Sequence, residues 1–316
     1  GIEVSGPHDT FVAKPRMLHL HQSEKIAREQ LFNFGFIAMK AYDTEWSAQF
    51  INKFIHPDGL IISAQNCWPD LEIAKIVGKN RAAGLVMSNI SVESYEPGKV
   101  SRPGHSRMRD MGHDVFRLGL HHKEETKEQE KIRKELEKIR KALDVIDSSV
   151  ITENLWGERW AKLCQNCMGN PVVAMSRLGT AELAGDEFCR KLQINLAREA
   201  TEIGVKLGLD FDEFGGASKD KWLQSDNKDT FLELDTMIKK RANGPNRRPS
   251  MGQDIHRGRK TEILHMSGHV LAEARALKID LPYTKKTMET IIQIDSGIIQ
   301  PNVDNVYTII NSLQRT

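Results

Sequence analysis

The first part of the chain contains three short apolar runs that are bounded by turn or polar residues. They cover Phe34–Ala41, Gly59–Gln65 and Ala82–Ser88. Runs of this kind are typical of buried strands in a parallel sheet. Helical stretches lie between them, one over 44–54 with Thr44 as its N-cap and another that starts after Trp68 with Pro69 at its first position. Strand and helix therefore alternate, which predicts an α/β fold with a parallel sheet and right-handed crossovers.

The pattern changes after residue 122, where charged residues predominate. Lys123–Lys141 contains six Glu and eight Lys or Arg. Through this segment an apolar stripe recurs at helical spacing, formed by Ile132, Leu136, Ile139 and Leu143. A solvated helix docked by one face is favoured over a coiled coil, because the stripe lacks the sustained heptads that a coiled coil needs.

From Glu153 onward the apolar positions have helical spacing, and no segment has the pattern of a strand. Helices are expected at 154–169, 182–208, 228–241, 256–278, 284–294 and 302–313. A further strand is expected over Val115–Leu120. The chain is therefore expected to consist of an α/β domain over 1–122, a charged linking helix over 123–150 and an all-helical domain over 151–316.

Composition excludes several classes of protein. The 316 residues include 45 Lys or Arg against 43 Asp or Glu, a net charge of +2, so no global basic field exists to hold nucleic acid or an anionic membrane. No apolar run is long enough to span a membrane. The 4 cysteines do not make a disulfide scaffold, and this favours a reducing, cytoplasmic compartment.

One polar constellation stands out in the segment WAKLCQNCMGNP. Lys162, Asn166 and Asn170 are spaced at successive i+4 steps, which drift by only about 40° each on a helix, so all three point to roughly one face. Pro171 is expected to break or kink the helix directly after them. A Lys and two amides on one face can hold an oxygen-rich small molecule, although spacing alone favours a solvent-facing polar stripe.

Polar residues also follow two of the predicted strands. Lys40 stands at the end of the first, and Asn66 closes the Ala64-Gln65-Asn66 sequence at the end of the second. Binding residues of open α/β sheets gather beyond the carboxyl ends of strands. Ordinary solvated strand ends explain the same residues equally well, so the pattern leaves both interpretations open.

A further candidate segment runs from Ser250 to Glu262. Ser250 and Asp254 can supply the N-cap and first-turn acid of the long helix expected after them. Glu262 is expected inside that helix, either as a surface charge or as a buried partner for a cation.

Two other motifs are interpreted as structural. Cys164 and Cys167 form a CxxC, but no second CxxC or HxxxH accompanies it, and buried cysteines often act as small hydrophobes. The 11 histidines are scattered, and neither His19 with His21 nor His121 with His122 has the ligand neighbours of a metal site. No metal is expected.

Taken together, these segments resemble one family, the ketopantoate (2-dehydropantoate 2-) reductases. The matching pieces are MKAYDT (39–44), SAQN (63–66), ENLWGERWAKLCQNCMGNP (153–171) and PSMGQDIHRGRKTEI (249–263). Their order and separations match from Gly1 to about Asn305. The resemblance implies a Rossmann-type domain that binds NADPH, followed by a helical domain similar to that of 6-phosphogluconate dehydrogenase.

The resemblance also implies roles for particular residues. It implies that NADPH reduces 2-dehydropantoate, or a related branched 2-oxo acid, on the route to pantothenate and coenzyme A. Lys162 falls on the catalytic lysine, and Glu262 on an active-site glutamate that orients Lys162 or binds a cofactor hydroxyl. The resemblance implies that Asn166, Asn170, Ser250 and Asn66 bind the substrate. It also places Lys40 and Asn66 near the nicotinamide of the cofactor. A small 2-oxo acid is the implied partner, and a homodimer is compatible with the resemblance.

The chain departs from the family pattern in three places. It contains no GxGxxG turn, and Gly1 matches a family segment beyond that turn, so the first βαβ unit is expected to be missing. Trp68 replaces a small residue after Asn66, and Thr180 stands where a polar substrate contact is common. The alternative hypothesis is a non-catalytic family member or fragment that binds a small acid or a partner through its helical domain.

Overall fold

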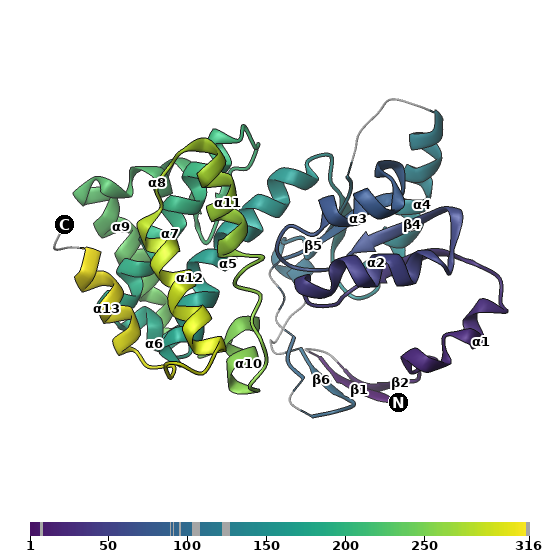
Figure 1. Cartoon of the computed structure of the whole chain (residues 1–316), viewed down its shortest axis with the longest axis horizontal. Coiled ribbons are helices and arrows are strands. Elements are labelled where there is room, and N and C mark those ends of the chain that lie inside the picture. Colours follow the sequence, from purple (N-terminus) through teal and green to yellow (C-terminus); the bar gives the residue numbers. More distant parts are fainter. Residues whose placement is uncertain are drawn as a thin grey trace. The chain divides into compact units, whose positions relative to one another are not determined.

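The computed structural model describes residues 1–6, 9–88, 90, 92–94, 96–102, 108–121 and 127–313. The chain divides into two compact units, Gly1–Leu155 and Trp156–Thr316 (Figure 1). Across the described ranges, none of the helices combines the length and the apolar character needed to cross a membrane.

The N-terminal unit is built on a five-stranded sheet with the order β3-β4-β5-β7-β8. The strands are β3 (Phe32–Ile37), β4 (Ile55–Ser63), β5 (Ala82–Met87), β7 (Phe116–Leu120) and β8 (Ser149–Ile151). The three predicted apolar runs pair in parallel, as expected. β7 is antiparallel to β5 and parallel to β8, so the sheet is mixed at this side, a feature that apolar runs alone cannot indicate.

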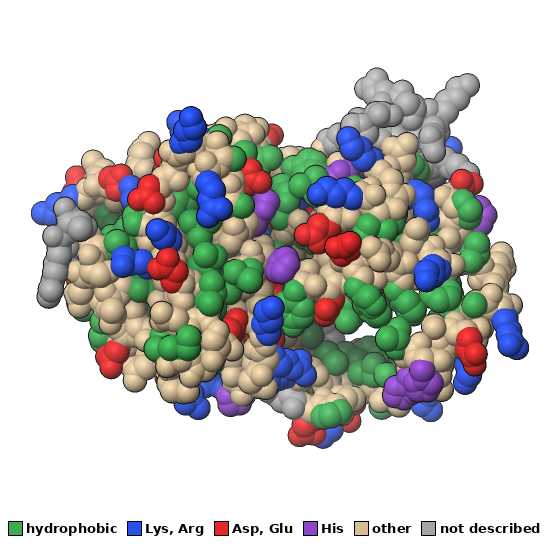
Figure 2. All heavy atoms as spheres, viewed as in Figure 1, with side chains coloured by type: hydrophobic (Ala, Val, Ile, Leu, Met, Phe, Trp, Pro, Cys, Tyr) green, Lys and Arg blue, Asp and Glu red, His purple; other side chains and the backbone are tan. Residues whose placement is uncertain are grey.

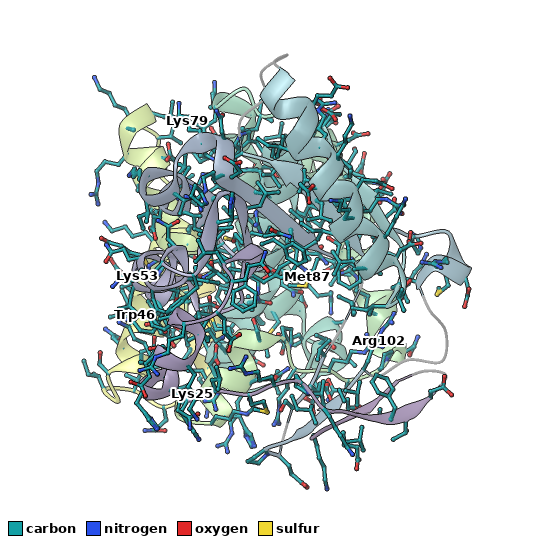
Figure 3. All side chains as sticks on the ribbon, turned by 90° about the vertical axis from the view of Figure 1, so that its right-hand side faces the viewer. Lys25, Trp46, Lys53, Lys79, Met87 and Arg102 are labelled. Carbon is teal, nitrogen blue, oxygen red and sulfur yellow. The ribbon has the colours of Figure 1, made fainter. Side chains whose placement is uncertain are left out.

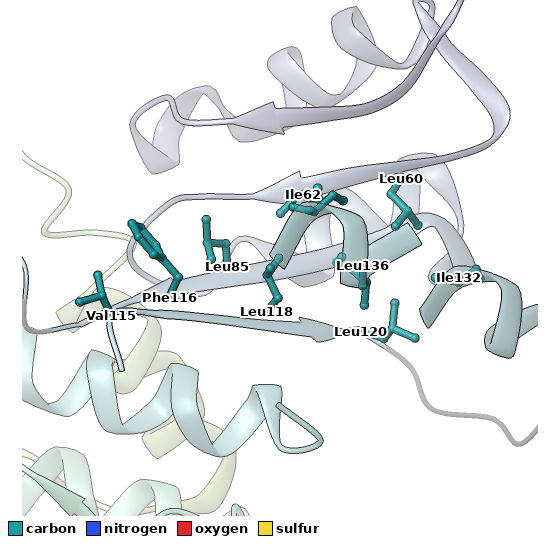
Figure 4. Close-up of a cluster of buried hydrophobic side chains, with 11 residues drawn as sticks. Leu60, Ile62, Leu85, Val115, Phe116, Leu118, Leu120, Ile132 and Leu136 are labelled. Carbon is teal, nitrogen blue, oxygen red and sulfur yellow. The ribbon is translucent and has the colours of Figure 1, made fainter. Parts of the chain in front are cut away.

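Helices cover both faces of this sheet. On one face α2 (Thr44–Asn52) and α3 (Asp70–Val77) pack on a core that includes Ile37 and Ile61. On the other face α4 (Lys127–Asp144) contributes Ile132, Leu136 and Ile139 to a cluster with strand residues such as Ile62 (Figure 4). The prediction that this charged helix carries an apolar stripe and packs by that one face is confirmed.

The charged helix is shorter than expected. It was predicted over 123–150, yet α4 ends at Asp144 and residues 149–151 form β8. Residues 122–126 lie outside the described part of the chain. Ser149 begins β8 because the backbone there pairs with β7. Phe116 of β7 is the partner of Ser149.

A second, three-stranded sheet lies in the same unit and was not predicted. It has the order β2-β1-β6, from β1 (Ile2–Ser5), β2 (Thr10–Ala13) and β6 (Lys99–Ser101), and the short helix α1 (Glu24–Ala27) follows β2. β1 is antiparallel to β2 and parallel to β6. Figure 3 looks onto this unit, with Trp46 of α2 labelled.

The C-terminal unit is helical, apart from a small hairpin of β9 (Glu213–Phe214) and β10 (Ala217–Ser218) that contradicts the expectation of no strand after Glu153. Its helices are α5 (Leu155–Ser176), α6 (Thr180–Gly185), α7 (Glu187–Lys206), α8 (Lys219–Leu223), α9 (Lys228–Lys239), α10 (Ser250–His256), α11 (Ser267–Leu277), α12 (Pro282–Asp295) and α13 (Asp304–Leu313). In Figure 2 acidic and basic side chains are interspersed over the visible face.

Two predicted helices are interrupted. The expected helix over 182–208 divides at Asp186, whose carboxylate accepts a hydrogen bond from the Cys189 N–H at 2.8 Å and so caps α7. The expected helix over 256–278 is absent as such, because α10 ends at His256 and α11 begins at Ser267. Glu262 therefore lies in a connecting segment.

The core of this unit forms where α5 and α7 approach closely. The indole N–H of Trp160 donates to the Ala200 carbonyl at 3.1 Å, and a Cβ on Gly204 would come within 2.1 Å of that indole nitrogen. Tight packing also explains why Pro171 does not end α5, contrary to expectation. Val172 and Val173 directly after it are buried, and this tertiary contact outweighs the one backbone N–H that proline removes.

Candidate active site

Lys162, Asn166 and Asn170 all lie on α5, which continues past them to Ser176. Because the helix is unbroken, the i+4 spacing places the three side chains on one face. Asn166 and Asn170 are each 7% exposed, and Lys162 is half-buried. Asn170 makes no side-chain hydrogen bond within the described residues, so its amide is available to a ligand.

Burial also changes the acid–base character of this face. It lowers the pKa of Lys162 from its usual value, since an ammonium loses hydration when it is buried. Among the described residues no carboxylate opposes this lowering of the Lys162 pKa. An amine in such a place can exchange a proton nearer neutral pH than an exposed lysine can.

The other side of α5 carries the CxxC. Cys164 and Cys167 are 0% and 2% exposed, and both are free thiols. Burial raises the pKa of the Cys164 thiol well above its ordinary value and raises that of Cys167 to about 12. The burial of both thiols agrees with the structural interpretation of this motif.

Ser250 opens the short helix α10 rather than capping a long one. α10 packs on α5 close to Asn170, because a Cβ on Gly252 would come within 2.6 Å of Val173 Cγ1. The chain before Ser250 is fixed by Thr180. Its hydroxyl donates to the Pro245 carbonyl at 3.2 Å and accepts from the Arg247 N–H at 3.0 Å. Thr180 is thus placed to hold the loop that presents Ser250.

Glu262 is 4% exposed and lies between two buried neighbours, Thr261 and Ile263. Its carbonyl accepts from the backbone N–H groups of His265 and Met266, each at 3.0 Å. The carboxylate of Glu262 is therefore carried by a turn, and buried residues anchor this turn on both sides. Sequence periodicity missed the turn because the apolar positions on both sides of it keep helical spacing.

In the N-terminal unit, Lys40 and Asn66 follow the parallel strands β3 and β4. Ile37 is paired with Ser63, so Lys40 and Asn66 each stand three residues beyond a paired position and emerge at the same edge. Gln65 ties the two ends together, because its amide donates to the Met39 carbonyl at 3.0 Å and to the Thr44 hydroxyl at 2.9 Å. Gln65 was not among the predicted site residues. Its position as a polar residue at the end of an apolar strand could have indicated this role.

Within the described ranges no group of three or more His, Cys, Asp or Glu is arranged to hold a metal ion.

Two family models match this chain. The model described as "Ketopantoate reductase PanE/ApbA" matches residues 1–112, and "Ketopantoate reductase PanE/ApbA C terminal" matches residues 154–295. A curated relative, the 2-dehydropantoate 2-reductase of Pyrococcus horikoshii, is 23% identical over 246 residues, which are 78% of this chain and 70% of that protein.

Solved structures resemble the whole fold. The 2-dehydropantoate 2-reductase of Geobacter metallireducens gives a TM-score of 0.72 at 20% identity, covering 93% of this chain and 86% of that one. A D-mandelate dehydrogenase with NADH and anilino(oxo)acetate also gives 0.72, at 17% identity, covering 94% and 86%. At these identities the likeness establishes the fold, a Rossmann-type sheet domain followed by a helical domain.

Proposed function

The chain belongs to the ketopantoate reductase family, whose members are oxidoreductases, and from this premise we propose that it reduces 2-dehydropantoate, or a related branched 2-oxo acid, with NADPH. The product is the 2-hydroxy acid, on the route to pantothenate and coenzyme A. The observation that carries the proposal is the buried face of α5 with Lys162, Asn166 and Asn170. The four free, buried cysteines support a reducing, cytoplasmic compartment.

In this reaction a ketone oxygen gathers negative charge as its carbon is reduced. Lys162 stabilises that charge and delivers a proton to the oxygen, for which its lowered pKa suits it. The amides of Asn166 and Asn170 supply both donors and acceptors for carbonyl, hydroxyl and carboxylate groups. Ser250, held by the loop that Thr180 fixes, binds the substrate carboxylate.

A nicotinamide cofactor, when bound, supplies the hydride that reduces the carbonyl carbon. Lys40 and Asn66, which share one strand-end edge, and the carboxylate of Glu262 are donor and acceptor types that fit its amide and ribose hydroxyls. The residues present fit the pyrophosphate of the cofactor less well, because the sequence contains no GxGxxG turn to bind it. We therefore expect residues 1–316 to bind NADPH weakly. Trp68 restricts the size of the accepted 2-oxo acid.

The decisive experiment measures NADPH oxidation by this chain in the presence of 2-dehydropantoate. Reduction that depends on the 2-oxo acid and is lost in Lys162→Ala supports the proposal, and equal rates in that variant contradict it. A control variant, Lys278→Ala, removes an exposed lysine of the same unit and should retain the rate.

The missing glycine turn favours one alternative, a non-catalytic member that binds a small acid through its helical domain. In that case calorimetry should detect binding of pantoate that Asn170→Ala weakens, while no NADPH is oxidised at any cofactor concentration. Fluorescence titration of NADPH up to high concentration separates the two cases, because the reductase should bind the cofactor weakly and the non-catalytic member should not bind it.

A further inference from the structure

A pocket of about 550 Å³ lies within the helical unit, apart from the residues assigned above. It is bounded by the end of α5, by α10, by the segment 258–264 and by the end of α12 with the turn after it. None of Lys162, Asn166, Asn170, Ser250 and Glu262 lines it. Its volume is that of a site for a small organic molecule.

The inner wall of this pocket is apolar. It includes Val173 and Ala174 of α5 and Ile263 and Ile294, all of them buried. Leu264 adds an apolar side chain at the mouth, where it is 50% exposed. A ligand can therefore bury an aliphatic body here, which is the main source of affinity in such sites.

The rim of the pocket is basic. Arg177, Arg248, Arg259, Lys260 and His256 line it, all of them exposed. The one carboxylate among the lining residues is Asp295, whose Oδ2 accepts two hydrogen bonds from Thr261. Arg248 acts electrostatically on Glu182, whereas Arg177 and Arg259 form no ion pair with any described residue. Two guanidinium groups therefore remain for an anion.

Arg177 lines the pocket from the end of α5, where its backbone is in the left-handed conformation. It follows the last residue of α5 with φ of 66°, and its N–H donates to the Val173 carbonyl at 3.0 Å. Helix ends of this kind favour glycine or asparagine, since a side chain is strained in the left-handed region. Lys278 ends α11 in the same conformation, so the φ of Arg177 belongs to the helix end, and glycine at this position would relieve its strain.

We propose that this pocket is a second ligand site, which binds a small organic anion with a carboxylate or phosphate headgroup and an aliphatic body. The headgroup is held by Arg177 and Arg259 as bidentate, charge-assisted hydrogen bonds, and the body lies against Val173, Ile263 and Ile294. The proposal does not rest on the reductase activity, because none of the predicted active-site residues lines the pocket and its test is a binding measurement.

The test is calorimetric titration of the 316-residue chain with octanoate and with octyl phosphate, and with octanol as the uncharged control. We expect both anions to bind and octanol to bind at least about tenfold more weakly. The relative affinities of octanoate and octyl phosphate distinguish the two headgroups.

Variants locate the binding. Arg177→Gly and Arg259→Gln should each raise the Kd for the anions about tenfold or more. Arg177→Gly should not lower the Tm of the chain, because glycine adopts the left-handed φ without strain. The controls are Arg275→Gln, an exposed arginine of α11 outside the pocket, and Lys162→Ala, which would abolish binding at the predicted active site instead. Unchanged anion binding in both pocket variants, octanol binding equal to octanoate, or loss of binding only in Lys162→Ala would overturn the proposal.

Discussion

The hydroxyl of Thr261 donates a hydrogen bond of 2.6 Å to the carboxylate of Asp295, and the Thr261 N–H donates to the same oxygen at 3.2 Å. Thr261 is 2% exposed and directly precedes Glu262. The end of α12 thereby fixes the segment that presents the predicted active-site carboxylate.

Thr261→Val keeps the shape of the side chain and removes its hydroxyl. Because a hydrogen bond to a charged group is lost, we expect unfolding free energy to fall by about 1.5–3 kcal/mol, as measured by urea denaturation. In the proposed reductase, kcat should fall together with stability if Glu262 is displaced. Asp295→Asn is the matched control, since its amide oxygen can still accept from Thr261. A Thr261→Val chain of wild-type stability would show that this contact does not hold the segment.

Lys162→Met is expected to stabilise the chain while strongly lowering the proposed activity. Since burial lowers the pKa of Lys162 in the folded chain from 10.5, the unfolded chain binds more protons between the two pKa values, and stability rises with pH there. The gain from methionine should therefore be largest below the lowered pKa and vanish as pH rises through about 10.5. Thermal melts of both chains against pH measure it. In the reductase assay kcat should fall by about 10²–10⁴. A variant less stable than the parent at neutral pH would contradict the burial of a charged amine.

Asp147 is expected to stabilise the N-terminal unit down to low pH. Burial raises its pKa, but this effect is outweighed by the Arg102 side chain and by N–H groups of Met108, Arg109 and Ser148, and the pKa falls to about 2. The carboxylate therefore contributes stability above pH 3.8, and this is lost as pH falls through about 2.

Asp147→Asn should accordingly cost about 2 kcal/mol at neutral pH and flatten the acid limb of the stability profile. The control is Glu135→Gln, which breaks an exposed pair with Lys138 and should change stability by less than about 1 kcal/mol. Equal effects of the two substitutions would show that burial of Asp147 is energetically unimportant.

The cysteines of the CxxC are expected to be unreactive in the folded chain. Because Cys164 and Cys167 are buried and have raised thiol pKa values, DTNB should modify neither until the chain unfolds. In denaturant the sequence provides 4 thiols, and the double variant Cys164→Ala, Cys167→Ala should provide two fewer. Rapid release of colour by the folded wild-type chain that is absent in this double variant would show that the CxxC thiols are accessible and reactive.

An aromatic row on β3 is expected to make the chain prone to association. Phe32, Phe34 and Phe36 are 45%, 40% and 37% exposed, and β3 is the edge strand of its sheet within the described residues. Phe34 and Phe36 are paired with Leu60 and Ile62, so they extend the sheet face that α4 covers farther along. Exposed edges of this kind favour pairing with another chain.

Phe34→Lys should therefore lower binding of the dye ANS and slow aggregation, at a cost in stability below about 1 kcal/mol. Leu60→Lys, on the neighbouring strand but 1% exposed, should instead unfold the unit. Unchanged light scattering after Phe34→Lys would show that the aromatic row is not the site of association.

Much of the fold and site could be predicted locally. The apolar runs around Ile37, Ile62 and Leu85 became strands because a short buried β-segment needs only its own residues and a turn at each end. The i+4 spacing of Lys162, Asn166 and Asn170 likewise fixed one helix face, because helical geometry is set by the backbone.

Other features were decided by contacts between distant residues. The continuation of α5 past Pro171 depends on packing around Val172 and Val173, and the placement of Glu262 in a turn depends on Asp295. The loop before Ser250 is held by Thr180, and the basic pocket joins α5, α10 and α12. Sequence spacing determines which side chains share an element, whereas burial, pKa and the meeting of separate elements arise only when the chain is packed, because they depend on neighbours that are far apart in sequence.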